Sequence, residues 1–145
     1  MTVREIKDNE LTELLGLYTH LHETGVPEQS EKLAETWATI INDKNHHIVV
    51  AEENGKIVSS VVCVIIPNLT RNVRPYAFIE NVVTHSDYRK QGYATACLNF
   101  ARDIAEHENC YKMMLLTSAK TEDTLNFYKK AGYNCTDKTA FIQWL

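Results

Sequence analysis

The segment from Ile79 to Thr95 holds the residue types in this chain that are best suited to chemistry. An apolar, β-branched run is followed by a polar loop with Arg89–Gln91, and Gly92 and Ala94 then open an amphipathic helix. The first N–H groups of a helix have no internal partner and lie at the positive end of its dipole. Because these two residues carry little side-chain bulk, a phosphate can approach those groups closely. The spacing indicates an anion site suited to phosphate or pyrophosphate.

The same R-x-x-G-x-A spacing is also compatible with a tight turn that binds nothing. Its place between an expected strand and an expected helix favours the anion site. The G-x-G-x-x-G spacing of a dinucleotide fold is absent. No G-K-[ST] follows either, which excludes a Walker P-loop.

Glu80 is a candidate general base because it interrupts an apolar strand, on the face expected to carry Phe78 and Val82. A half-buried carboxylate there has a raised pKa and can accept a proton from a substrate, directly or through water. The competing interpretation is a solvent-facing carboxylate, or one paired with Arg71 or Arg74.

Tyr128 is a candidate general acid, because its phenolic hydroxyl can donate a proton to a leaving group. The alternative is an ordinary core tyrosine, since Phe127 and Tyr128 lie on a helix with apolar neighbours. His85 is a second candidate base, although its loop position favours exposure.

The hydropathy pattern predicts one domain, residues 1–145, with a mixed α/β (α+β) sheet in the order β-α-α-β-β-β-α-β-α-β and one optional further strand. Asn54–Gly55 between two strand-like runs is a hairpin signal, because a type I′ turn needs positive φ at both central residues. Strands are expected at 3–6, 47–53, 56–66, 76–83, 112–116, 133–135 and 140–144. Helices are expected after Asp8 or Asn9, after Ser30, at 92–107 and at 121–131, with Gly132 as the last C-terminal cap.

Composition narrows the function classes. The chain has 145 residues, with 15 Lys and Arg against 19 Asp and Glu, a net charge of -4. This balance gives no support for a non-specific nucleic-acid partner. The four cysteines form no C-x-x-C pair and the six histidines show no metal-ligand spacing, so reduced thiols and no metal are expected. No apolar run is long enough for a membrane helix, and the N-terminus lacks a signal core. A soluble, cytoplasmic protein is therefore expected.

With these motifs in place, the chain resembles the GNAT superfamily of N-acetyltransferases over essentially its whole length. Arg89-x-x-Gly92-x-Ala94 after a strand ending in Val82–Val83 resembles the acetyl-CoA motif of that superfamily. The run 125–133, LNFYKKAGY, is similar to its second signature. The segments 78–83 and 110–112 are similar to the small-molecule branch that contains glucosamine-phosphate N-acetyltransferases.

The resemblance implies direct transfer of acetyl from acetyl-CoA to the amine of a small molecule, with Tyr128 and Glu80 as catalytic residues. It also implies a set of cofactor contacts, several of them through backbone groups: Val82, Val83, Thr84, Arg89, Lys90, Gln91, Gly92, Tyr93, Ala94, Thr95 and Thr124. It suggests that the 67–75 loop and the segment 20–23 border the acceptor, which makes these residues acceptor candidates: Arg71, Arg74, Tyr76 and His22.

Three positions depart from the family pattern. His85 stands where many members have Pro, Ala94 replaces a commoner Gly, and Thr121 or Thr124 replaces an Asn that holds the pantetheine arm. Two other functions remain open, a protein N-terminal or lysine acetyltransferase and a non-catalytic acyl-CoA-binding module. Homodimers are common in such folds, and the sequence leaves the oligomeric state open.

Overall fold

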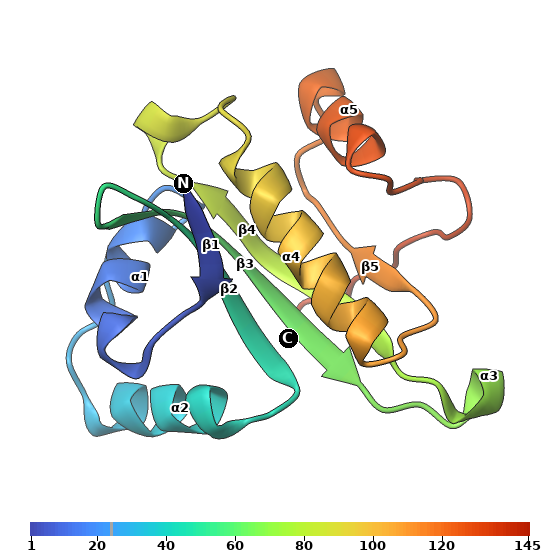
Figure 1. Cartoon of the computed structure of the whole chain (residues 1–145), viewed down its shortest axis with the longest axis horizontal. Coiled ribbons are helices and arrows are strands. Elements are labelled where there is room, and N and C mark those ends of the chain that lie inside the picture. Colours follow the sequence, from blue (N-terminus) through green and yellow to red (C-terminus); the bar gives the residue numbers. More distant parts are fainter. Residues whose placement is uncertain (24) are drawn as a thin grey trace.

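The computed structural model describes residues 1–23 and 25–145. It is a mixed α/β fold, as the sequence predicts (Figure 1). The strands are β1 (Thr2–Glu5), β2 (His46–Glu53), β3 (Lys56–Ile66), β4 (Tyr76–Thr84) and β5 (Met113–Leu115). The helices are α1 (Leu11–Tyr18), α2 (Glu31–Asn42), α3 (Thr70–Val73), α4 (Tyr93–His107) and α5 (Glu122–Lys130), with short 3-10 turns at Asp8–Glu10 and Ser86–Tyr88.

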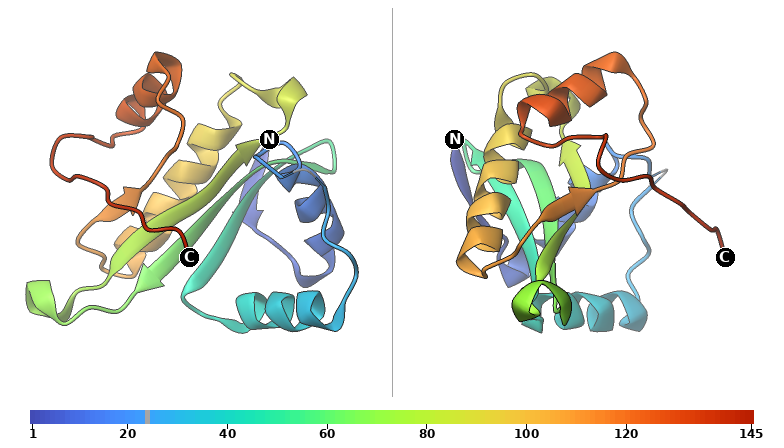
Figure 2. Two further views of the ribbon diagram at one scale, coloured as in Figure 1. Left: turned by 180° about the vertical axis from the view of Figure 1, so that it is seen from behind. Right: turned by 90° about the vertical axis from the view of Figure 1, so that its right-hand side faces the viewer.

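The five strands form one sheet in chain order, β1-β2-β3-β4-β5. The first four are antiparallel, and β5 runs parallel to β4. Helix α4 covers one face of this sheet, α1 and α2 lie on the other face, and α5 lies beside α4 beyond β5 (Figures 1 and 2).

Alternation along the strands gives the sheet two apolar faces, and each face has its own cluster. On β2, Val49 and Ala51 pack with α4, whereas Ile48 and Val50 pack with α1 and α2. All four side chains are buried, as expected for a sheet with helices on both sides.

Local chemistry explains the positions of the turns. Asn54 and Gly55 both have positive φ, 51° and 77°, so the predicted hairpin between β2 and β3 is confirmed. Ser30 caps α2, its hydroxyl accepting from the Leu33 N–H at 3.1 Å. Gly132, at φ 95°, follows the end of α5 as predicted.

The feature that creates a site is the divergence of β4 and β5. Their pairing covers only three positions, ending at Ile79 and Leu115, while β4 continues to Thr84. Just past the last pair, the β3–β4 register shifts because β4 holds one extra residue, and Asn81 takes a left-handed φ of 48°. A bulge of this kind bends a strand and redirects its side chains.

The prediction of two strands at the C-terminal end is wrong. Residues 133–135 and 140–144 form no strand in the structure. The amide N–H groups of Thr136 and Asp137 donate to the Asn134 side chain, which turns the chain just after Tyr133. The following segment then runs outward, exposed, instead of joining the open edge of β5 (Figure 2).

Candidate active site

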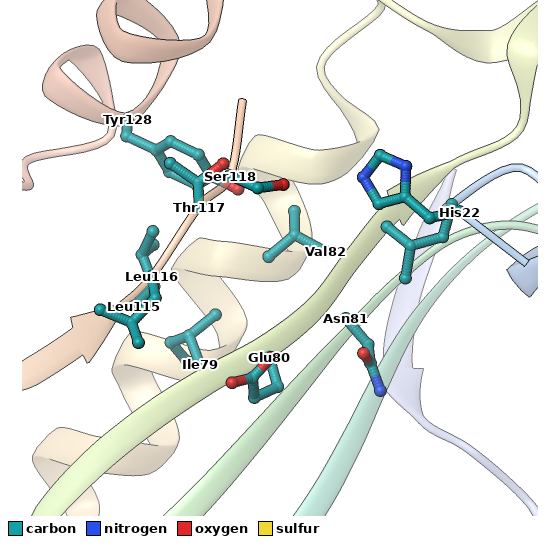
Figure 3. A pocket seen from close by; sticks show the side chains of 11 residues that line it. His22, Ile79, Glu80, Asn81, Val82, Leu115, Leu116, Thr117, Ser118 and Tyr128 are labelled. Carbon is teal, nitrogen blue, oxygen red and sulfur yellow. The ribbon is translucent and has the colours of Figure 1, made fainter. Parts of the chain in front are cut away.

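A cavity of about 220 Å³ lies where β4 and β5 diverge (Figure 3). Its walls come from the segment after α1, from the bulged part of β4, from the end of β5 with the loop beyond it, and from α5. The lining residues are Leu21, His22, Ile79, Glu80, Asn81, Val82, Leu115, Leu116, Thr117, Ser118 and Tyr128. Four of the predicted site residues are thus brought together: Glu80, Val82, Tyr128 and His22.

The bulge at Asn81 changes which side chains of β4 share a face. Val82 packs with Ile79 against the α4 side, and Val83 packs on the α1–α2 side. Figure 3 shows Ile79 and Val82 on one side of β4, with Glu80 on the other. The expectation that Glu80 and Val82 share a face is therefore wrong, since the inserted residue reverses the alternation.

Glu80 is exposed, so the interpretation as a solvent-facing carboxylate is confirmed and the half-buried one is wrong. It occupies the bulge, where β4 has lost its β5 neighbour, and it borders the open space between the sheet and helices α1 and α2. The alternative pairing with Arg74 does not form either, because Arg74 donates to the backbone carbonyls of Asn109 and Cys110 at 3.1 and 2.9 Å.

Tyr128 reaches the cavity from α5, with its ring directed toward the 117–118 segment (Figure 3). Its ring packs edge-on against Phe127 and Tyr133, at centroid distances of 4.9 and 6.2 Å. Burial raises the pKa of Tyr128 above its ordinary value of 10.0. The hydroxyl is therefore protonated at neutral pH, which is the state a general acid needs.

The backbone of β4 is also exposed to the cleft. The N–H of His85 bonds to Val58 on β3. Because successive residues of a strand point their backbone groups to opposite edges, those of Thr84 and Val82 point toward the side that β5 has left. Apart from the Thr84 carbonyl, which accepts from Arg89, these groups can pair with an extended ligand as a further strand would.

The start of α4 fits an anionic group. Gly92 is its N-cap with φ 90°, and no side chain caps the helix. The first internal bond runs from the Ala96 N–H to Gly92, so the N–H groups of Tyr93, Ala94 and Thr95 have no partner within the residues the structure describes. A fifteen-residue helix with free donors at its positive end suits phosphate.

The polar side chains before this helix have structural contacts of their own. Arg89 donates to the carbonyls of Thr84 and His20, at 3.2 and 3.1 Å, and so ties the β4–α4 loop to the segment after α1. Gln91 donates to the Asp87 carbonyl at 2.9 Å. Lys90 lies 3.7 Å from Asp123 with both side chains almost fully exposed, so its ammonium stays available to a ligand.

The side chains of Tyr93 and Thr121 also make contacts within the fold. The Tyr93 side chain is buried and its hydroxyl donates to Glu53 at 3.2 Å, which leaves only its backbone for a ligand. Thr121 caps α5, accepting from the Thr124 N–H at 3.3 Å and donating to the Thr124 hydroxyl at 2.9 Å. Thr124 retains its own hydroxyl proton for a ligand.

His85 lies outside the cavity lining. Its Nδ1 accepts from the Asp87 N–H, and its ring stacks on His20 at a centroid distance of 4.1 Å. Burial, together with the neighbouring Lys56 ammonium, lowers the pKa of His85. The ring organises the loop before α4.

Three acceptor candidates lie at the opposite end of β4 from the cleft. Tyr76 is its first residue, and Arg71 and Arg74 belong to and follow the short α3 turn. The Arg71 guanidinium lies 5.7 Å from the centre of the Tyr111 ring. None of the three lines the cavity beside Tyr128.

A second cavity of about 380 Å³ opens between the sheet and helices α1 and α2. It shares only Glu80 and Asn81 with the first cavity, so the bulge lies between the two spaces. Its remaining lining residues are mostly apolar and include no Lys or Arg within 1–23 and 25–145: Leu11, Leu14, Leu15, Tyr18, Leu33, Thr36, Trp37, Ile40, His46, Ile48, Val62 and Val64.

Sequence reasoning missed Asn81, Thr117 and Ser118 as site residues. One signal was present for Asn81, because Asn in a β-branched run tolerates positive φ and can mark a bulge. Thr117 and Ser118 follow the short strand β5. Nothing in the sequence around them shows that β4 and β5 diverge there and open a cavity.

No group of three potential ligands among the described His, Cys, Asp and Glu side chains could hold a metal ion. Within residues 1–23 and 25–145, no helix has the length and apolarity to cross a bilayer.

Comparison with known proteins identifies the family to which this chain belongs. The model of the Acetyltransferase (GNAT) family matches residues 11–133. A glucosamine 6-phosphate N-acetyltransferase from Trypanosoma brucei brucei is 29% identical over 142 residues, 95% of this chain and 92% of that protein. A solved structure from Agrobacterium tumefaciens, assigned as an acetyltransferase, covers 100% of both chains with 36% identity and a TM-score of 0.92. Glucosamine-6-phosphate N-acetyltransferase from Arabidopsis thaliana shares the fold, with 22% identity, a TM-score of 0.80 and coverage of 99% and 97%.

Proposed function

Because the chain belongs to the GNAT family of acetyltransferases, we propose that it transfers an acetyl group from acetyl-CoA directly to the primary amine of a small molecule. The observation that carries this proposal is the cleft between β4 and β5. Tyr128 lines it from α5 and Glu80 lines it from β4, where Glu80 also borders the second cavity, so a proton donor and a proton acceptor both adjoin the cleft.

The residues present fit acetyl-CoA. The free N–H groups at the start of α4 and the Lys90 ammonium suit its phosphates, and the outward-facing backbone of Val82 and Thr84 suits its amide-containing arm. Thr124, beside Tyr128 on α5, offers a hydroxyl for the same arm. When bound, the cofactor supplies an acetyl group activated as a thioester.

The protein moves two protons. The Glu80 carboxylate accepts one from the acceptor ammonium, because only the neutral amine is nucleophilic. Tyr128 Oη donates one to the leaving sulfur. A backbone N–H near Val83 polarises the carbonyl that is attacked, as an oxyanion donor does.

Direct transfer is supported by the state of the cysteines. Burial raises the pKa of Cys63 and of Cys97 to about 12, so both remain thiols at neutral pH. Neither lines the cavity, and a covalent acyl-cysteine step has no nucleophile there.

The acceptor enters from the side of the second cavity, because Glu80 points away from Tyr128 and borders that space. Apolar walls without a basic side chain favour an amine whose body is aromatic or aliphatic. An amino sugar phosphate is the second candidate, supported by what the names of the relatives say they act on.

One assay tests the proposal. Release of free CoA thiol from acetyl-CoA is measured with apolar amines, amino sugars, amino acids and peptides with a free N-terminus or lysine. Release with a small amine supports it, and release with peptides alone favours a protein acetyltransferase. Tight acetyl-CoA binding with no release for any acceptor favours a non-catalytic binding module.

A further inference from the structure

The segment that follows α1 is tied to the loop between β4 and α4 through one residue, His20. The Arg89 guanidinium donates to the His20 carbonyl at 3.1 Å, and the Ser86 N–H donates to His20 Nδ1 at 3.3 Å. The ring centres of His20 and His85 lie 4.1 Å apart. These three interactions form the His20 contact, which holds both the backbone and the side chain of His20 on the loop.

The loop side of the His20 contact is itself fixed to the sheet. Arg89 Nε donates to the Thr84 carbonyl at the end of β4, at 3.2 Å. The His85 N–H donates to the Val58 carbonyl on β3, at 2.9 Å, and Lys56 Nζ lies 3.2 Å from His85 Nε2. The segment after α1 therefore takes its position from a loop that is anchored to two neighbouring strands.

The His20 contact lies between the two halves of the candidate active site. Leu21 and His22 follow His20 directly and line the cavity, and Figure 3 shows His22 across that cavity from Tyr128. On the loop side, Arg89 is followed closely by the free N–H groups that open α4. A change in the loop when phosphates bind there is thus transmitted to a wall of the cavity.

From this arrangement we infer that His20 is a positioning residue, which sets the place of the Leu21–His22 wall relative to the cofactor site and so couples acceptor binding to cofactor binding. Coupling between two sites requires an element whose position both ligands bias, and the segment after α1 adjoins both. The coupling rests on the proposed function, because its two ligands are acetyl-CoA and the acceptor amine. The His20 contact itself does not depend on any ligand.

The chemistry of the imidazole provides a matched pair of variants. His20 Nδ1 accepts a hydrogen bond only when the ring is neutral and carries its proton on Nε2. His20→Asn keeps an acceptor, because the amide oxygen occupies the same branch position as Nδ1, whereas His20→Leu removes it. His107→Leu is the control, because His107 is an exposed histidine in the last turn of α4.

Amide hydrogen exchange measured by NMR tests the His20 contact without ligand or activity. The Ser86 amide is expected to exchange slowly in the unaltered chain, in His20→Asn and in His107→Leu. In His20→Leu it should exchange about tenfold faster, as the loss of one hydrogen bond implies. Circular dichroism checks that each variant is folded.

The ring nitrogen shifts of His20 in the unaltered chain are a second readout, which needs no variant. They should identify the neutral tautomer with its proton on Nε2 at pH values where the ring is uncharged. A proton on Nδ1, or a Ser86 amide that exchanges equally fast in the unaltered chain and in His20→Leu, overturns the inference.

Addition of CoA alone tests the coupling. CoA is expected to slow exchange at the start of α4 in every variant. The amides of Leu21 and His22 should also slow in the unaltered chain and in His20→Asn, but not in His20→Leu. Equal slowing of these two amides with and without the His20 side-chain acceptor overturns the coupling, and so does the absence of any slowing in the unaltered chain.

Steady-state kinetics then separates a failed inference from a failed function. We expect His20→Leu to raise the KM for the acceptor by about tenfold, a usual size for coupling between sites, and His20→Asn to restore it. The kcat and the KM for acetyl-CoA should change by less than about twofold. An unchanged acceptor KM, or a fall in kcat alone, overturns the positioning role. If no sample releases CoA thiol, the proposed function fails, while hydrogen exchange still decides the His20 contact and its response to CoA.

Discussion

At the scale of single residues, Tyr128 is the side chain on which the proposed reaction depends most. Replacing it with Phe removes the proton donor and keeps the ring that packs on Phe127. We expect kcat to fall by about 10²–10⁴-fold with little change in the KM for acetyl-CoA, the usual effect of losing a general acid. Steady-state kinetics measure both.

Tyr133→Phe is the matched control for that change. Tyr133 contacts the Tyr128 ring and lies outside the cavity, and burial raises its pKa to about 12. It should keep full activity. Because burial raises the Tyr128 pKa above 10.0, its hydroxyl stays protonated through neutral and mildly alkaline pH. An alkaline loss of rate beginning well below pH 10.0 would therefore have another cause. Equal losses of kcat in Tyr128→Phe and Tyr133→Phe would contradict the assignment of Tyr128 as the general acid.

Glu80→Gln tests the base through its pH profile. Without the carboxylate, only the fraction of the amine that is already neutral in solution can react. That neutral fraction grows as pH rises. We expect kcat/KM well below the unaltered chain at neutral pH, with a gap that narrows toward the pKa of the acceptor. Glu106→Gln, an exposed carboxylate on α4, is the control and should follow the unaltered profile. If kcat/KM of Glu80→Gln stayed below that of the unaltered chain by the same factor at every pH, Glu80 would position the acceptor rather than act as a base.

At the scale of elements, the start of α4 can be tested separately from the stability of the helix. Gly92 and Gly132 both have positive φ, 90° and 95°, with open space around the position of a Cβ. Alanine at either position forces a left-handed backbone, at about 1–2 kcal/mol of stability. Only Gly92 lies beside the free N–H groups at the α4 start.

We therefore expect Gly92→Ala and Gly132→Ala to lower the unfolding free energy by similar amounts, and only Gly92→Ala to weaken CoA binding. Urea unfolding and calorimetric titration with CoA measure the two quantities. Equal effects on CoA affinity would place the cofactor phosphates elsewhere.

Elements with strong local signals are predictable from the sequence, and the candidate site is only partly so. The Asn54–Gly55 hairpin, the Ser30 cap and α4 follow from short-range chemistry. The bulge at Asn81 comes from how β4 meets β3, and it reverses the face that Glu80 occupies. The structural role of Arg89 is equally hard to predict from local sequence. Its carbonyl partners, on Thr84 and His20, depend on a contact between distant segments.

At the scale of the whole molecule, the predicted strand at 140–144 shows where local pattern and chain path differ. Its aromatic and β-branched residues, Phe141, Ile142 and Trp144, favour a strand, yet the turn at Asn134 directs them away from their own sheet.

The arrangement of the two cavities about Glu80 predicts acceptor preference. An amine with an aromatic or aliphatic body should have a higher kcat/KM than glucosamine 6-phosphate, because the walls beyond Glu80 are apolar. Leu33→Asp puts a charge into that wall and should lower kcat/KM for the apolar amine by about tenfold or more, with the KM for acetyl-CoA unchanged. Ala34→Asp, on the next residue of α2 and exposed, is the control and should leave both constants unchanged. Preference for glucosamine 6-phosphate, with no effect of Leu33→Asp, would mean that the acceptor body does not enter the second cavity.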